Sequence, residues 1–303
     1  MQFLPLVMLI AAVYCAAILI HQGVFSRRSL NLAPQRPNQL RLRDAVVAAA
    51  VFYGWLYFLL VYPIPLFNLV HRNYKAYLFW AGAIWFISHC AVLLLLIAIA
   101  KRGFGTLSNV GLSWTRLSAG LRIGGAAFLL TTPILAVVTG LSYGVYRYAT
   151  GENPPVHPIL RFFASHPPWP RFMMVTIYLC FWDPLIEELL FRGILQTTVF
   201  RILDRRRALL EMPTGEGMNT PSPAAATRPN ATDRWTAILI TAAIFAASHL
   251  YLARGAIAWM PAIFVSGCVL GFVYERTGNL FANWANHCLL NTCALVVYLS
   301  FHW

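Results

Sequence analysis

Charge is scarce in this sequence, and negative charge is scarcest. Only 11% of the 303 residues are Asp, Glu, Lys or Arg, and just 10 are acidic, whereas apolar residues make up 59% of the chain. A soluble domain carries about 25% charged residues, because its surface must be hydrated. So little charge excludes a soluble globular domain and a disordered chain. We therefore expect an integral membrane protein.

Closely spaced pairs of cysteines, such as CxxC motifs, are also absent from the sequence. The six cysteines are spread over apolar runs, and no two of them form a CxxC motif. This pattern excludes a disulfide framework and a thiolate zinc site. It is typical of cysteines that pack as small apolar side chains within helices.

Lys and Arg outnumber the acidic residues and give a formal net charge of +13. They lie mainly in the connections between apolar runs, where basic residues set the orientation of a membrane protein and meet anionic lipid headgroups. No basic stripe is interleaved with aromatic residues in the way that nucleic-acid binders require. We expect the lipid bilayer as a partner, and no nucleic acid.

Long apolar runs are what this sequence has in abundance. A bilayer core of about 30 Å is crossed by a helix of about 20 apolar residues. We therefore predict an all-α fold, a polytopic transmembrane helix bundle of about eight spans. The predicted spans are residues 3–22, 45–63, 77–100, 120–143, 172–200, 235–253, 256–275 and 280–301.

The fifth predicted span contains charges that lipid should reject. Asp183, Glu187, Glu188 and Arg192 lie within it, and each ionisable group at membrane depth costs at least about 2.5–3.5 kcal/mol. Glu188 and Arg192 are four residues apart, so they share a helical face and can pair. Glu187 is rotated by about 100° and is free to face a different space. Charges of this kind usually mark a functional site.

Two further spans carry polar groups at depth. His249 ends the sixth predicted span, and the eighth carries His287 and Asn291, which are four residues apart and share a face. Short connections join the last three spans, so these groups should be brought together. Taken as straight helices, the spans would place His249 and His287 at depths about 10 Å apart, at 1.5 Å per residue. Tilted helices or shifted boundaries would remove this difference.

Two kinds of chemistry suit this set of residues. In amide hydrolysis, a buried carboxylate takes a proton from water while His and Asn side chains stabilise the oxyanion. In a zinc site, two His and one carboxylate hold the metal and leave a position for water. There is no HExxH motif, and the spacing alone does not separate the two mechanisms.

The same residues are also compatible with roles outside hydrolysis. Glu187, Glu188 and Arg192 could form a purely structural ion-pair network. A proton-coupled transporter would also place carboxylates and His at depth, although no internal repeat is visible. His89, in the third predicted span, is interpreted as a structural hydrogen-bonding residue.

Three motifs in the C-terminal half resemble those of one family of membrane proteases. This is the CPBP or Abi family, which comprises type II CAAX prenyl proteases and bacteriocin-processing intramembrane proteases. The match covers about residues 175–300. The motifs are Glu187-Glu188-x-x-x-Arg192, Phe245-x-x-x-His249 and His287-x-x-x-Asn291, with Gly267-x-x-x-Gly271-x-x-x-Glu275 leading into the third.

The resemblance implies a glutamate-dependent endopeptidase that hydrolyses a peptide bond of a membrane-associated substrate within the bilayer. Glu187 and His249 would activate water, His287 and Asn291 would stabilise the oxyanion, and Glu188 would pair with Arg192. Eukaryotic members of the family remove the last three residues of prenylated CAAX proteins, and bacterial members are linked to bacteriocin processing and self-immunity. The implied partners are therefore a membrane protein or a lipidated peptide, and a non-catalytic immunity or scaffold protein is an alternative.

The family is often labelled metalloprotease. These residues fit a non-metal mechanism better, so we expect no bound cofactor or metal, with zinc as the alternative. The implied organisation is N-terminal transmembrane helices at residues 1–150 and a catalytic helix core at 171–303. Residues 208–234 would form a flexible inner loop within this core. We expect a multi-pass protein of a bacterial inner membrane.

Overall fold

The computed structural model describes residues 4–61, 74–210, 230–250 and 255–302, with the exception of residues 25, 32 and 35. Within these ranges all regular structure is helical and there is no strand, which confirms the predicted all-α class. The helices of the bundle are α1 (Leu4–His21), α3 (Leu42–Val61), α5 (Tyr74–Phe104), α6 (Leu117–Thr150), α8 (Trp169–Ile177), α9 (Asp183–Glu188), α10 (Thr197–Leu210), α11 (Ala231–Ala247), α12 (Met260–Thr277) and α13 (Leu280–His302). Short helices α2 (Arg27–Asn31) and α7 (Pro158–Ala164) lie in the connections.

Each of the eight predicted apolar spans contains a helix. Among the described residues, three helical stretches are long and apolar enough to cross a membrane, at Phe86–Phe104, Trp114–Thr150 and Ala256–Thr277. The chain is therefore an integral membrane protein. The number of eight spans stays a prediction.

A continuous helical rod from α8 to α10 carries the acidic motif. Two π-helical segments, Tyr178–Trp182 and Leu189–Gln196, flank the short helix α9. Pro184 stands at the start of α9, and a proline lacks the N–H that a regular helix needs and clashes with the preceding turn. Wider π turns accommodate such interruptions and are frequent at functional sites.

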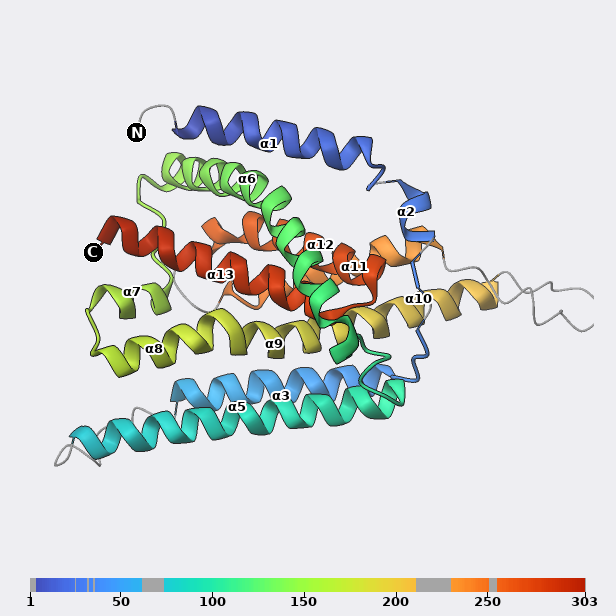
Figure 1. The fold of residues 1–303 in the computed structure, drawn as a ribbon, viewed down its shortest axis with the longest axis horizontal. Helices are drawn as coiled ribbons and strands as arrows, with labels where there is room; N and C mark the ends of the chain where they lie inside the picture. Colours follow the sequence, from blue (N-terminus) through green and yellow to red (C-terminus); the bar gives the residue numbers. More distant parts are fainter. Residues whose placement is uncertain are drawn as a thin grey trace, which may run out of the picture.

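Helices pack on both sides of this rod. Figure 1 shows α3 and α5 side by side along one face of the rod, with α13 along the opposite face. Helix α11 also packs directly on the rod, and α12 packs against α11. Helix α1 lies outside this group, against α6, and the start of α1 and the end of α13 lie at the same end of the bundle (Figure 1). One core cluster joins Phe52 of α3, Leu96 of α5 and Phe191 of the rod. The predicted catalytic helix core thus shares its hydrophobic interior with helices of the N-terminal region.

Helix α6 crosses α13 at very short range. A Cβ atom added at Gly124 would lie 2.5 Å from the carbonyl oxygen of Ala282, and Gly120 is similarly crowded by Phe281. Small residues spaced by four allow membrane helices to approach closely, because van der Waals packing drives their association in lipid. The glycines of α6 therefore set the position of α13, which carries His287.

The segment before α3 contacts the end of α12, where α11 and the rod also meet it. The Arg36 guanidinium lies 3.4 Å from the Glu275 carboxylate of α12, and Arg234 of α11 pairs with the same carboxylate. Gln196 donates a hydrogen bond of 3.0 Å to the other Glu275 oxygen. One buried carboxylate thus ties three helical segments and the N-terminal connection together.

The predicted loop at residues 208–234 is shorter at both ends in the structure. Helix α10 continues to Leu210, and α11 begins at Ala231. Asn230 caps α11 by accepting a hydrogen bond from the Thr232 N–H, and this explains the early start of the helix. Residues 211–229 lie outside the described residues.

Candidate active site

Glu188 is the centre of a buried polar cluster. Its Oε1 accepts a hydrogen bond of 3.0 Å from the Arg192 guanidinium and one of 2.9 Å from Nδ1–H of His287. Its Oε2 accepts a bond of 3.0 Å from the Asn283 amide. A second nitrogen of Arg192 donates to the Gly267 carbonyl oxygen at 3.4 Å. Both oxygens of the Glu188 side chain are thus engaged, and the predicted pairing of Glu188 with Arg192 is present.

Glu187 lies beside this cluster but is bonded differently. Its Oε2 is 3.6 Å from Nε2 of His287, beyond hydrogen-bond distance, and its side chain is 14% exposed, whereas that of Glu188 is fully buried. His287 therefore stands between the two carboxylates, with one ring nitrogen facing each. Glu187 is the carboxylate that a water molecule or a substrate can reach.

Phe245 brings the two histidines to the same level of the bundle. Its ring centroid is 5.0 Å from that of His249 and 6.0 Å from that of His287. The Arg192 guanidinium lies over the same ring, at 4.6 Å, which is a favourable cation–π geometry. The depth difference expected from straight spans is thus absent, because α11 ends at Ala247 and His249 follows in a turn.

The ring of His249 is oriented by the backbone. Its Nδ1 lies 2.8 Å from the Phe245 carbonyl oxygen, so Nδ1–H donates to that carbonyl and Nε2 is left as an acceptor. A nitrogen in this state can accept a proton from water.

Asn291 lies one turn beyond His287 on the same face of α13. Its amide donates a hydrogen bond of 2.9 Å to the Leu179 carbonyl oxygen in the first π segment. One N–H of the same amide is not used by this bond. Of the six predicted site residues, the structure thus joins Glu188, Arg192 and His287 directly, sets Glu187 and His249 next to them, and ties Asn291 to the adjacent backbone.

Three residues near the site were missed in the sequence. Asn283 stands four residues before His287, so the helical spacing could have shown that it shares the face of the site. Tyr53 of α3 is close enough to Glu187 to interact with it electrostatically. His157, in the connection before α7, is close enough to His249 for the two to interact electrostatically. No sequence signal pointed to the last two, because they are distant in the chain from the residues that they approach.

A catalytic metal needs several ligating side chains that converge on one point. No group of three or more His, Cys, Asp or Glu side chains in the described ranges is placed to hold an ion. The Glu188 oxygens accept from Arg192, His287 and Asn283, and a cation bound there would face the guanidinium. The metalloprotease description therefore has no support in this part of the chain.

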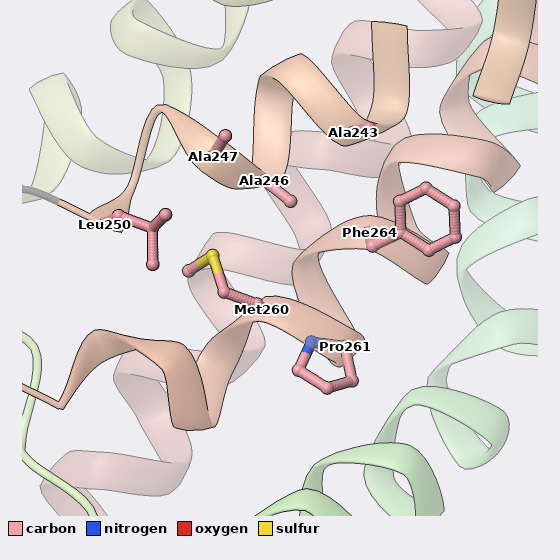
Figure 2. Close-up of a pocket in the computed structure, with 7 residues that line it drawn as sticks. All are labelled: Ala243, Ala246, Ala247, Leu250, Met260, Pro261 and Phe264. Carbon is pink, nitrogen blue, oxygen red and sulfur yellow. The ribbon is translucent and has the colours of Figure 1, made fainter. Parts of the chain in front are cut away.

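An apolar pocket opens beside the site, between α11 and α12. It has a volume of about 370 Å³ and is lined by Ala243, Ala246, Ala247, Leu250, Met260, Pro261 and Phe264. Figure 2 shows the side chains of Leu250 and Met260 facing one another across the gap between the two segments. Ala247 and Leu250 flank Ser248 and His249 in the sequence, so the pocket adjoins the turn that carries His249.

Comparison with known protein families identifies the part of the chain that carries this site. Residues 169–293 match the family model of the Rce1-like type II CAAX prenyl endopeptidases. This part of the chain, less than half of the 303 residues, is therefore similar to the Rce1-like family. The Rce1-like region holds all six predicted site residues together with Asn283, and the predicted CPBP resemblance is confirmed. No curated protein and no solved structure matches the chain.

Proposed function

We propose that this protein is an intramembrane endopeptidase that uses Glu187 to activate water. The observation that carries the proposal is the contrast between two adjacent carboxylates. Glu188 is fully buried and engaged by three donors, whereas Glu187 is partly exposed and faces His287. A structural network would occupy both carboxylates, while a hydrolytic site needs one of them to be accessible.

The first step is attack of water on the peptide carbonyl. Glu187 takes one proton from the water as its oxygen bonds to the carbonyl carbon. Nε2 of His249, which the Phe245 carbonyl leaves as an acceptor, orients the same water. The C–N bond then breaks as the proton passes from Glu187 to the leaving amine.

Oxyanion stabilisation is assigned to α13. Glu188 and Glu187 flank His287 on its two ring nitrogens. The His287 ring is the proposed N–H donor to the developing oxyanion. The second N–H of the Asn291 amide is the other proposed donor.

The substrate class follows from the surroundings of the site. The apolar pocket beside His249 suits a membrane-embedded or lipidated peptide, and its volume falls within the range of about 300–1,000 Å³ that is usual for ligand pockets. A prenylated CAAX-type peptide is the first candidate. We propose the inner membrane of a bacterium as the location, and no metal or other cofactor.

The test is cleavage of a farnesylated CAAX peptide by the purified protein in liposomes. Glu187→Gln keeps the shape of the side chain but cannot take a proton, so we expect cleavage to fall by roughly 10²–10⁴-fold. The matched control is Glu152→Gln in an exposed loop, which should keep the wild-type rate. Equal rates for Glu187→Gln and the wild type would contradict the mechanism, and loss of stoichiometric zinc together with activity would contradict the metal-free assignment.

A further inference from the structure

A second chain of polar residues leads away from the site toward α5. His89 of α5 is fully buried, and its Nε2 is hydrogen-bonded to the hydroxyl of Tyr178 in the first π segment. Tyr178 in turn donates a hydrogen bond of 3.1 Å to Oδ1 of Asp183. Three helical segments thus contribute to one line of hydrogen bonds that ends on a carboxylate.

The direction of these bonds is determined by their chemistry. A tyrosine hydroxyl has one proton, and here that proton is donated to Asp183. The hydroxyl oxygen must therefore accept from His89, so the His89 proton lies on Nε2. Both donors point toward Asp183, which makes Asp183 the acceptor at the end of the line.

The ring of His89 is held in place by packing. The Trp55 ring meets it edge-on with centroids 3.9 Å apart, and the Tyr178 ring meets it at 4.2 Å. The line is thus fixed in a rigid, water-excluding environment, where hydrogen bonds are stronger than in water.

Asp183 is one helical turn before Glu187, so the two share a face of α9. The Asp183 and Glu187 carboxylates are close enough to interact electrostatically. The line therefore holds a third carboxylate on the face of α9 that carries Glu187. Nothing else in the mechanism requires His89, Tyr178 or Asp183.

We propose that Asp183, Tyr178 and His89 are positioning residues of the hydrolytic site. His89 and Tyr178 hold the Asp183 carboxylate on the face of α9 that carries Glu187, where its charge supports proton transfer. This inference rests on the proposed endopeptidase function and extends the functional site to α5.

The kinetic test separates positioning from packing. Tyr178→Phe removes only the bridging hydroxyl, and Asp183→Asn removes only the charge. We expect each to lower kcat by roughly 10- to 100-fold, with KM within twofold of the wild type. His89→Gln keeps an N–H donor and should retain most of kcat, whereas His89→Leu should lose it.

Tyr274→Phe is the matched control. Tyr274 is fully buried, and its hydroxyl donates to the Val110 carbonyl oxygen, outside the line. This variant loses one buried hydroxyl, as Tyr178→Phe does, and should keep kcat. A Tyr178→Phe enzyme with the kcat of Tyr274→Phe would overturn the proposal, and so would equal activities of the two His89 variants.

An infrared measurement distinguishes failure of this proposal from failure of the proposed function. The Asp183 carboxylate band, identified by its loss in Asp183→Asn, should shift in Tyr178→Phe and His89→Leu but not in Tyr274→Phe. An unshifted band overturns the line of hydrogen bonds, whether or not the protein cleaves peptides. A shifted band in a protein that cleaves nothing supports the line and contradicts the protease.

Discussion

Glu187 and Glu188 are adjacent in the sequence, and their surroundings give them different tasks. Glu188 neutralises Arg192 and anchors His287. Glu187 makes no hydrogen bond of this kind and keeps an exposed edge. Removing either residue should abolish activity, but only one removal should also destabilise the fold.

Stability measurements on the two alanine variants separate these roles. Glu188→Ala leaves the Arg192 guanidinium buried without its carboxylate, which costs about 3–5 kcal/mol. Glu187→Ala breaks no close ion pair with Arg192, so its free energy of unfolding should change much less. Thermal unfolding in detergent should show a clearly lower Tm for Glu188→Ala. Equal losses for the two variants would contradict the assignment.

His157 provides a pH-dependent contribution outside the membrane helices. Burial, and then the charge of nearby His249, lowers the pKa of His157 from 6.5 to about 4. Between these two values the unfolded chain takes up a proton that the folded protein does not. The contribution of His157 to the free energy of unfolding is therefore fully present above about pH 6.5. It is lost as the pH falls toward about 4, and the loss amounts to roughly 3 kcal/mol at most.

His157→Asn tests this assignment. Nδ1 of His157 accepts from the Ile159 N–H at the start of α7, and Asn can replace that cap but does not titrate. Tm of the variant should fall less than that of the wild type between pH 6.5 and 4. Identical pH dependence in the two proteins would refute the role of His157.

At the residue scale, local spacing predicted what lies within one helix. The Glu188–Arg192 pair followed from a separation of four residues, and the same rule applied to His287 would have found Asn283. The line from His89 to Asp183 could not be predicted, because it depends on α5 meeting the π segment near Tyr178. His89 was correctly interpreted as a hydrogen-bonding residue, but the sequence did not indicate that Tyr178 is its partner.

Close backbone contacts determine where the helices pack, as much as the length of their apolar runs does. Gly124 of α6 touches the backbone of α13, whereas a Cβ at the adjacent Gly125 would meet nothing within 4 Å. The two positions share the same helix and the same intrinsic cost of substitution. They therefore form a natural matched pair.

Substituting each glycine with valine tests the α6–α13 contact. Gly124→Val should destabilise the protein by about 1–3 kcal/mol or more, because the neighbouring backbone cannot yield. It should also lower activity, since α13 carries His287. Gly125→Val should leave Tm and activity near wild type. A Tm for Gly124→Val as high as that for Gly125→Val would show that the two helices do not meet as described.

At the element scale, apolar run length predicted a helix within each of the eight segments. It did not predict the two π segments around α9, since Pro184 alone indicates an interruption but not its form. It also did not predict the attachment of the N-terminal connection to Glu275, which Arg36 makes over a long separation in the chain. Such contacts depend on the assembled bundle.

The whole molecule combines a region that matches a protease family with N-terminal helices that lie outside the match. The Rce1-like region covers residues 169–293, yet α3 and α5 complete its core through Phe52 and Leu96. The motifs of the region predicted the family resemblance and the pairing of Glu188 with Arg192. The contribution of the N-terminal helices appears only in the structure, because apolar packing residues carry no distinctive motif.

Membrane proteomics tests the central claim without assuming a substrate. Cells that produce the wild-type protein are compared with cells that produce Glu187→Gln at the same level, and the new peptide termini of membrane proteins are identified by mass spectrometry. The account predicts termini in apolar or lipidated segments that are present with the wild type and absent with Glu187→Gln. Identical sets of termini, with a phenotype that survives the substitution, would instead indicate a non-catalytic membrane protein or a transporter.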